Sequence, residues 1–249
     1  MKNLENTTIY APCTLKLKDE ADKEYLLTIE QDDYAEDPRS WDNISTIWTW
    51  TRSYKIGDDH DLSDSMWDAL ADLCVENTDL TWEEIEGKNL SENQLGLALQ
   101  ESGNVAFRWI SAYEHSGITI STAVGSCPYN DHWDSGIIGF GFITKKQYEE
   151  QCEKNAEGWE RRALKIIDFE VETVDQWLRG ECYRFTLEEK VHCRNEKRCP
   201  HCNELISVDE YDDWEEVDSC CGFYGSDIKE NGVFDYFGDE YEFVEKITK

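Results

Sequence analysis

The chain has 249 residues, of which 39% are apolar and 12% aromatic, and its 55 Asp and Glu against 24 Lys and Arg give a formal net charge of -31. This composition excludes a disordered acidic tail, because ten Trp, twelve Tyr and nine Phe supply the area of a packed core. The charge excludes a protein that grips nucleic acid directly, since such binding depends on Lys and Arg that displace counterions from phosphates.

No segment has the pattern of a membrane span or an export signal. No run approaches the ~20 apolar residues that a spanning helix needs, and the stretch Met1–Asn6 lacks the apolar core of a secretory signal. We therefore expect a soluble cytoplasmic protein that makes no membrane contact. In that compartment the ten cysteines are expected to be reduced thiols or metal ligands rather than disulfides.

The N-terminal part of the chain is expected to alternate strands with turns. Runs rich in β-branched and aromatic residues predict strands at Thr7–Leu17, Tyr25–Glu30 and Asn43–Thr51. The stretch Gln31–Ser40, with its acidic cluster and its proline, predicts a loop, and Gly57–His60 predicts a turn.

Helical spacing of apolar residues begins after this turn. It predicts a helix over residues 63–76, capped by Ser63 or Asp61, and a second helix at Ser91–Glu101. The remaining pattern predicts strands at Val105–Ile110, Ile118–Thr122, Ile137–Thr144, Glu181–Glu188 and Trp214–Ser219, and helices at Lys145–Asn155 and Trp159–Leu178. Gly180 is a normal C-terminal stop for the last of these helices.

These elements predict an α+β fold in which an antiparallel sheet packs against helices. Because no repeat or clear linker interrupts the chain, residues 1–249 are expected to form a single domain. A small Cys-rich excursion is expected within it at residues 190–222.

A row of carboxylates is expected along one face of the first helix. Its members are Asp61, Asp64, Asp68, Asp72 and Glu76. Spacing of three or four residues places them on one side of a helix, and at about 1.5 Å per residue they recur about every 5 to 6 Å. That interval is comparable to the separation of neighbouring phosphates along a nucleic-acid strand. An ordinary solvated helix face is the alternative interpretation.

The C-terminal region is a second acidic block. Residues 201–249 hold 15 Asp and Glu against three Lys, and aromatic residues interrupt the acidic runs. Its densest part contains Asp212, Asp213, Glu215 and Glu216. Carboxylates that steer a partner, combined with aromatic anchors, are typical of protein contact surfaces. An edge strand protected by charge is the alternative.

The cysteine pattern predicts one structural zinc ion and no other cofactor. Cys199-Pro200-His201-Cys202 is a C-x-x-C motif, the usual half of a structural zinc site. Cys193 and Cys220 are the candidates for the other two thiolates, with His192, His201 and Cys221 as substitutes. A redox C-x-x-C and plain reduced thiols are the alternatives.

Catalytic motifs are sparse. The chain contains no P-loop, no dinucleotide fingerprint, no H-E-x-x-H and no G-x-S-x-G motif. His132, Asp134 and Ser135 in the stretch Cys127–Gly136 are nevertheless a candidate site for a metal-dependent enzyme. Because 55 carboxylates place acidic neighbours beside most histidines, we do not expect catalysis.

Five short sequence segments, which we call phrases, occur in the chain in a recognisable order. They are Asp37–Asn43, Tyr54–Asp58, His132–Gly139, Val174–Glu181 and Asp218–Gly225. In this order they resemble an uncharacterised family of acidic proteins from phages and other mobile elements of bacteria, over roughly residues 25 to 235. The resemblance implies an accessory protein in the cytoplasm of a bacterial host. By analogy, small acidic phage proteins often disarm host defences, and some mimic DNA.

We therefore expect an acidic inhibitory protein that blocks a host defence nuclease, of the anti-CRISPR or anti-restriction type, by nucleic-acid mimicry. Its expected partner is a basic nucleic-acid-binding protein or defence complex, and not nucleic acid itself. The alternatives are the metal-dependent enzyme with a site around Cys127–Gly136 and a zinc-stabilised protein-interaction adaptor.

Overall fold

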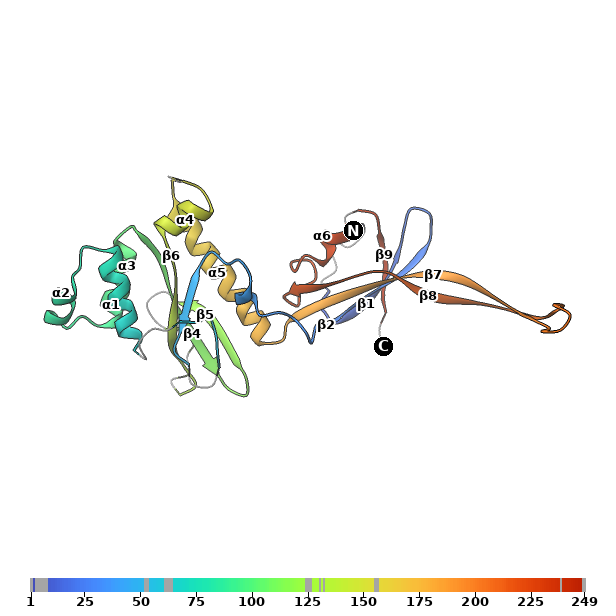
Figure 1. Ribbon diagram of the computed structural model, residues 1–249, viewed down its shortest axis with the longest axis horizontal. Helices are drawn as coiled ribbons and strands as arrows, with labels where there is room; N and C mark the ends of the chain where they lie inside the picture. Colours follow the sequence, from blue (N-terminus) through green and yellow to red (C-terminus); the bar gives the residue numbers. More distant parts are fainter. Residues whose placement is uncertain are drawn as a thin grey trace. The chain divides into compact units, whose positions relative to one another are not determined.

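The computed structural model describes residues 2, 9–51, 54–60, 65–123, 127–129, 131, 133–154, 157–237 and 239–247. The chain divides into two compact units (Figure 1). Unit 1 comprises Met1–Glu36 and Gly180–Lys249, and unit 2 comprises Asp37–Arg179. The expectation of one domain is thus corrected to two units, the second inserted into the chain of the first. The α+β class with antiparallel sheets is confirmed.

Unit 1 is built on a five-stranded antiparallel sheet with strand order β8-β7-β2-β1-β9. Its elements are β1 (Cys13–Lys18), β2 (Glu24–Gln31), β7 (Cys182–Arg198), β8 (Leu205–Tyr224), α6 (Val233–Phe237) and β9 (Glu242–Ile247). In β1 the alternation of apolar and polar residues buries every second side chain, which is the period of a strand with one face on a core. Asp19 accepts hydrogen bonds from the backbone N–H groups of Ala21 and Lys23, and so forms the turn that joins β1 to β2.

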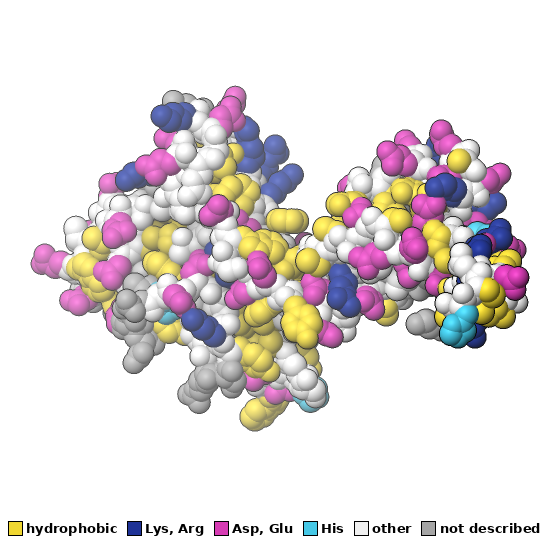
Figure 2. All heavy atoms as spheres, turned by 45° about the vertical axis from the view of Figure 1, so that its right-hand side comes forward, with side chains coloured by type: hydrophobic (Ala, Val, Ile, Leu, Met, Phe, Trp, Pro, Cys, Tyr) yellow, Lys and Arg dark blue, Asp and Glu magenta, His cyan; other side chains and the backbone are white. Residues whose placement is uncertain are grey.

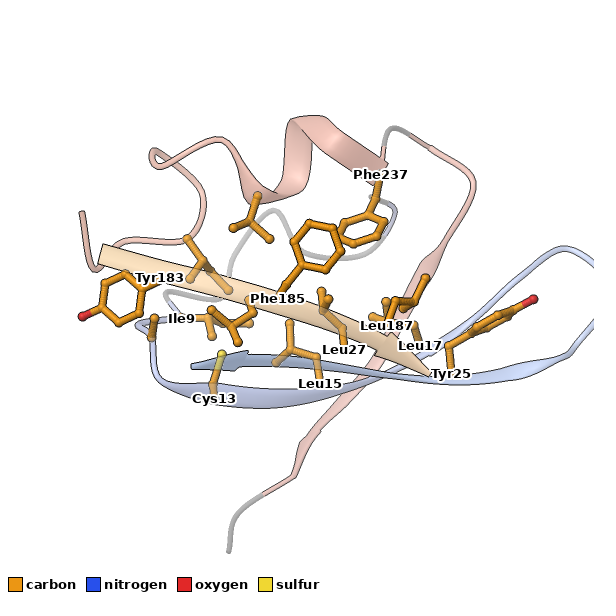
Figure 3. Packing of buried hydrophobic residues seen from close by; sticks show 14 residues of the cluster. Ile9, Cys13, Leu15, Leu17, Tyr25, Leu27, Tyr183, Phe185, Leu187 and Phe237 are labelled. Carbon is orange, nitrogen blue, oxygen red and sulfur yellow. The ribbon is translucent and has the colours of Figure 1, made fainter. Parts of the chain in front are cut away.

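The core of unit 1 lies between one face of this sheet and helix α6 (Figure 3). Leu15 pairs with Leu27 across β1 and β2, and Leu27 pairs with Leu187 of β7, so that one face of three strands is apolar. Phe237 of α6 packs on Phe185 of β7 with ring centroids 4.7 Å apart. Burying aromatic rings of this size is what holds a short five-residue helix on the sheet.

Strands β7 and β8 form a hairpin that is longer than its sheet. β7 pairs with β2 only from Tyr183 to Glu189, while its pairing with β8 continues to Arg198 opposite Leu205. Beyond Glu189 only β8 pairs with β7, so this part of the hairpin is a two-stranded ribbon. We call it the β7–β8 ribbon (residues 190–213). The predicted Cys-rich excursion at residues 190–222 is corrected, because regular strands run through most of it.

Unit 2 is built on a four-stranded antiparallel sheet with strand order β3-β6-β4-β5. Its strands are β3 (Thr46–Thr49), β4 (Val105–Glu114), β5 (Ile118–Ala123) and β6 (Ser135–Thr144). Its helices are η1 (Pro38–Ser40), α1 (Met66–Asn77), α2 (Trp82–Gly87), α3 (Glu92–Glu101), α4 (Lys145–Gln151) and α5 (Trp159–Leu178). Helices α1 to α3 lie on one side of the sheet and α5 lies on the other (Figure 1).

Both faces of this sheet are buried, which explains the nearly continuous apolar run of β4. On one face the side chains of α1 and α3 pack on aromatic rings that include Phe107 and Phe140. On the other face Ile167 and Val171 of α5 pack on aliphatic side chains. Gly96 lets α3 approach the sheet closely, because a Cβ at this position would lie 2.6 Å from the ring of Trp109.

The helix predicted at Trp159–Leu178 is confirmed with the same bounds. The strands predicted at Glu181–Glu188 and Trp214–Ser219 are much longer in the structure, as β7 and β8. The remaining predicted elements shift by up to about six residues at their ends, and η1, α2, α6 and β9 were not predicted. The predicted terminal or capping residues Thr7, Asp61, Ser63 and Asn155 lie outside the described residues. Among the helices that the structure describes, none has the length and apolar character required to cross a bilayer.

Candidate partner-binding surface and cysteine hairpin

Helices α1 to α3 are short, and each begins at a residue whose side chain caps the exposed N–H groups. The hydroxyl of Ser65 accepts from the backbone N–H of Asp68 at the start of α1. Thr81 with Glu84 and Ser91 with Gln94 form capping boxes at the starts of α2 and α3. With Leu70, Leu73, Leu95 and Leu99 buried on the sheet, the polar residues of these helices are left on the outer surface.

Three of the predicted partner-binding carboxylates follow one line along α1. Asp68, Asp72 and Glu76 are four residues apart, so their side chains lie on one face and rise by about 6 Å from one to the next. Asp72 and Glu76 are exposed, and neither makes an ion pair within the part of the chain that the structure describes. Asp68 is half-buried. Asp61 and Asp64 lie outside the described residues.

The acidic character extends from α1 across α2 and α3. Residues 66–101, which we call the acidic helical layer, hold nine Asp and Glu against the single cation Lys88. Lys88 forms an ion pair with Glu84, 3.3 Å away. Residues 145–165, which form α4 and the first part of α5, hold six Lys and Arg against five Asp and Glu. Figure 2 shows basic side chains gathered over that region, so the negative charge of unit 2 is not spread evenly.

The acidic residues of β8 are arranged differently. Successive residues of a strand point to opposite faces, so Asp212 and Glu216 lie on one face of the hairpin and Asp213 and Glu215 on the other. Asp212 is paired, because Lys190 Nζ and His192 Nδ1 lie 2.9 and 3.1 Å from its carboxylate oxygens. The hydrogen bond from Lys190 lowers the pKa of Asp212 below its usual value, with further help from His192. These four carboxylates do not form one row.

The predicted zinc ligands are not brought together. Cys193 lies opposite Tyr211 in the ribbon, whereas Cys220 lies opposite Phe185 in the body of the sheet. At about 3.3 Å per residue, Cys193 is about 20 Å along the strand from Cys199, and the position of Cys220, opposite Phe185, is about 46 Å from Cys199. Sulfurs bound to one zinc at about 2.3 Å each lie within about 4.6 Å of one another. The four predicted thiolates therefore do not fit a zinc site within one chain.

Only Cys199 and Cys202 of this set meet, in the turn that closes the ribbon. The backbone N–H groups of Cys202 and His201 hydrogen-bond to the sulfur of Cys199 and lower the pKa of its thiol below the usual value. All ten cysteines are free thiols. Within the described ranges, no group of three or more His, Cys, Asp and Glu side chains is arranged to hold a metal ion.

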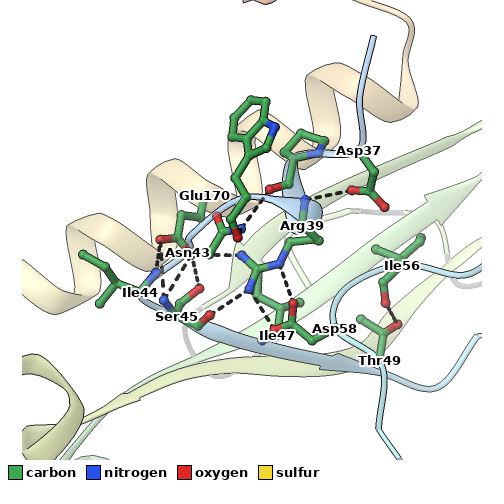
Figure 4. A network of polar contacts seen from close by, with 12 residues as sticks. Asp37, Arg39, Asn43, Ile44, Ser45, Ile47, Thr49, Ile56, Asp58 and Glu170 are labelled. Atoms are coloured by element: carbon green, nitrogen blue, oxygen red, sulfur yellow. Dashed lines mark hydrogen bonds and ion pairs between the residues drawn. The ribbon is translucent and has the colours of Figure 1, made fainter. Parts of the chain in front are cut away.

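A buried ionic network holds the segment around η1 in unit 2 (Figure 4). The guanidinium of Arg39, with its side chain 4% exposed, donates to both oxygens of Asp58 at 2.9 and 2.7 Å and to Glu170 at 2.9 Å. Glu170 also accepts from the backbone N–H of Ile44 at 3.0 Å and from the hydroxyl of Ser45. Burial alone lowers the pKa of Arg39, but the hydrogen bonds and charges of the two carboxylates raise it overall. These carboxylates are structural.

Asp175 of α5 is a second structural carboxylate. It accepts hydrogen bonds from the hydroxyl of Thr119 at 2.6 Å and from the backbone N–H of Ile120 at 2.7 Å, and it pairs with Arg179. It thereby fixes the last turns of α5 to strand β5. Arg39, Asp58, Asp175 and Arg179 fall in the phrases that carry the resemblance, so these parts of the phrases have a structural role that sequence reasoning missed. Arg39 followed by Asp58, an isolated cation and a distant carboxylate, gave no signal of their pairing.

The candidate enzyme site around Cys127–Gly136 is open. Asp134 lies 3.0 Å from Nδ1 of His115, a residue of the β4–β5 turn that the sequence analysis did not select. The His115 side chain is 65% exposed, and Trp133 beside them is 96% exposed. The hydroxyl of Ser135 donates to the backbone carbonyl of Asp131. His132, the histidine of this candidate site, lies outside the described residues.

Comparisons of the chain with protein-family models, with curated proteins and with solved structures find no match.

Proposed function

We propose that this protein is an inhibitory binding protein whose acidic helical layer occupies a cationic, nucleic-acid-binding groove on a host defence nuclease, of the anti-CRISPR or anti-restriction type. The observation that carries the proposal is the line of carboxylates on α1, exposed at Asp72 and Glu76 and continued by the acidic residues of α2 and α3. Mimicry of this kind needs no catalytic group and no cofactor.

The spacing of these carboxylates supports the proposal. A row with a rise of about 6 Å between members presents its charges at intervals comparable to phosphates along a strand. Lys and Arg side chains that are placed to contact phosphates accept carboxylates in the same way, by charge-assisted hydrogen bonds. Like charges at i and i+4 destabilise a helix slightly, so the arrangement of Asp72 and Glu76 brings no benefit to the isolated fold.

The rigidity of the layer also supports the proposal. Helices α1 and α3 join the buried core through leucines and α2 joins it through Ile85, and each helix starts at a cap or capping box. Carboxylates on such a support lose little conformational freedom when they meet a partner, which favours affinity. The resemblance to acidic accessory proteins of mobile elements supports a defence nuclease as the kind of partner.

Capture from a bacterial lysate tests the proposal. Protein immobilised on beads is exposed to lysate at low ionic strength and then washed with excess duplex DNA or with sodium chloride of equal ionic strength. We expect a nuclease or other nucleic-acid-binding protein to leave with the DNA and to remain in the salt wash, because the two ligands share one groove. When purified, that nuclease is expected to stop cutting DNA at equimolar inhibitor.

The matched bait carries Asp72→Lys and Glu76→Lys, which convert the exposed part of the row to cations and give the lysine at position 72 an i,i+4 partner in Asp68. We expect this bait to retain its fold by circular dichroism and to capture no DNA-releasable protein. Equal capture by both baits, or release by neither wash, would show that the acidic helical layer does not occupy a nucleic-acid groove.

A further inference from the structure

The turn that closes the β7–β8 ribbon presents two thiols in a fixed geometry. The backbone N–H of Cys199 donates to the carbonyl of Glu204 at 2.8 Å, and the N–H of Asn203 donates to the carbonyl of Cys199 at 2.9 Å. Asn203 has a φ of 58°, the left-handed conformation that Asn tolerates well. The backbone N–H groups of residues 201 and 202 hydrogen-bond to the sulfur of Cys199, which also contacts the thiol of Cys202.

These contacts hold the two sulfur atoms in an arrangement that suits the binding of a soft metal ion. Zinc is bound by thiolates, and hydrogen bonds from backbone N–H groups stabilise the negative charge on a ligating sulfur. The turn thus supplies two thiolate ligands on one side of a metal ion. Zinc in a structural site takes four ligands in a tetrahedron. Two more are therefore required.

Within the part of the chain that the structure describes, no other residues of the same chain supply the two further zinc ligands. Cys193 is about 20 Å along the strand from the turn, and the remaining described cysteines lie in other elements. The nearest carboxylate, Glu204, accepts from the thiol of Cys202 at 3.6 Å, but no three-ligand group forms there among the described residues. Because the two thiols are not joined by a third ligand in any such group of described residues, the other side of the metal is left open to a second molecule.

We propose that Cys199 and Cys202 of two copies of this chain bind one zinc ion between them, which joins the ribbons tip to tip in a homodimer. Each copy contributes an identical pair of thiolates, so the interface is isologous with the metal on its two-fold axis. On binding, four thiols lose their protons to solvent and four Zn–S bonds form. No electron is transferred, and the centre carries a charge of minus two.

The charge distribution of the ribbon favours this arrangement. Two copies that each carry a net charge of -31 repel one another over most of their surfaces. The ribbon is less acidic than the chain as a whole, because residues 190–213 hold four Lys and Arg against six Asp and Glu, and its end, residues 197–206, holds two Lys and Arg against one Glu. Lys197 and Arg198, next to the thiols, bring positive charge from both copies to the dianionic centre.

Exposed apolar side chains provide a second, independent observation. Leu205 and Ile206, which directly follow the turn, are 48% and 59% exposed. Apolar residues on a thin ribbon have no core to join within the chain, and contact with the same residues of a second copy would remove them from water. The apolar pair and the thiols thus lie at the same end of the ribbon, where a partner copy would cover both.

The test is the mass and metal content of the purified full chain under a non-chelating reductant. Adding zinc at pH 7.5 is expected to convert the 29.1 kDa monomer to a dimer by light scattering, with one zinc per two chains. EDTA is expected to reverse the conversion. Cobalt in place of zinc is expected to give the charge-transfer and d–d absorption of a tetrahedral four-thiolate site. Lowering the pH is expected to weaken the dimer, because protons compete with the metal for thiolates.

The variant Cys199→Ser with Cys202→Ser replaces the half-buried sulfur of Cys199 and the exposed sulfur of Cys202, and it is expected to remain monomeric with zinc. Cys152→Ser with Cys221→Ser removes two other exposed thiols and is the matched control, which is expected to dimerise normally. One zinc per monomer, a dimer that forms without metal, a dimer that survives loss of both turn thiols, or no zinc binding would each overturn the proposal. These outcomes are independent of inhibition by the acidic helical layer.

Discussion

The acidic helical layer and the β7–β8 hairpin are similar in acidic composition, but their carboxylates are arranged differently on the surface. Both are dense in Asp and Glu, yet on α1 the carboxylates at every fourth position line up, while on β8 adjacent ones point to opposite faces. The hairpin also pairs Asp212 with Lys190 and His192, whereas Asp72 and Glu76 have no such ion pair among the described residues. The period of the secondary structure, and not the composition, decides where charge becomes a coherent surface.

The interior of unit 2 adds a third situation. Asp58, Glu170 and Asp175 are carboxylates with complete sets of partners, and they hold loops and helices in place. A large negative charge therefore includes groups that stabilise the fold, groups that pair on the surface and exposed groups that make no ion pair among the described residues. Each can be separated from the others by experiment.

The largest effect on stability is expected from Arg39→Ala. This change leaves Asp58 and Glu170 without their common cation in a site where the Glu170 side chain is 11% exposed. Removing one member of a buried ionic network costs about 3 to 5 kcal/mol. Urea unfolding followed by tryptophan fluorescence measures the change. Arg162→Ala, which removes the exposed pair with Glu153, is the control and is expected to cost about 0 to 1 kcal/mol.

Alkaline pH is expected to weaken unit 1 in particular. Burial, together with the hydrogen bond to Asp19, raises the pKa of Tyr25 to about 12. A raised pKa means that the folded state favours the protonated phenol, so its contribution is complete below about pH 10 and is lost as the pH rises towards 12. The midpoint of urea unfolding is expected to fall over this range in the wild type and to fall less in Tyr25→Phe. Equal slopes would show that the phenol does not control the loss.

A smaller effect is expected at Asp212 of the ribbon. Because Lys190 and His192 lower its pKa, the folded state favours the carboxylate, and this contribution is present above about pH 4 and lost as the pH falls further. Carboxyl-carbon NMR is expected to show Asp212 titrating below its usual value, and Lys190→Ala is expected to move the titration upward. If the pKa of Asp212 were the same in Lys190→Ala as in the wild type, Lys190 would not be an effective partner of Asp212.

The smallest effect is a gain in stability. Glu76→Gln removes one of two like charges at i and i+4 and is expected to stabilise α1 by about 0.2 to 0.5 kcal/mol at low salt. Glu84→Gln is the matched opposite, because it keeps a capping-box side chain but removes the ion pair with Lys88 and a negative charge from the first turn, and it is expected to destabilise α2. Thermal unfolding at low and high salt measures both. A loss of stability in Glu76→Gln would show that this carboxylate already has a partner.

Much of the fold follows from local patterns in the sequence. The bounds of α5 are predictable because its apolar period continues for twenty residues and stops before a glycine. Helix α2 has only six residues, too few for a period, although Thr81 and Glu84 are the capping signature that marks its start. The ribbon escapes prediction because a strand exposed on both faces has no apolar alternation.

The candidate surface is predictable in part for the same reason. Helical spacing alone places Asp68, Asp72 and Glu76 on one line. Contacts set by strand register are different, because a sequence does not reveal that Cys220 stands opposite Phe185 or that His115 meets Asp134. The partnership of Arg39, Asp58 and Glu170 likewise depends on how η1 and α5 pack, which no local pattern records.

The most direct test of the central claim compares two charge reversals in one DNA-displacement assay. A labelled duplex is bound to the captured nuclease, and unlabelled inhibitor is added at low salt. Wild-type protein and Asp212→Lys with Glu216→Lys are expected to displace the duplex with affinities within about threefold of each other. The affinity of Asp72→Lys with Glu76→Lys is expected to be lower by about 100-fold or more, where each factor of ten corresponds to about 1.4 kcal/mol of binding free energy. Equal displacement by both variants, or binding of wild-type protein without displacement, would contradict the account.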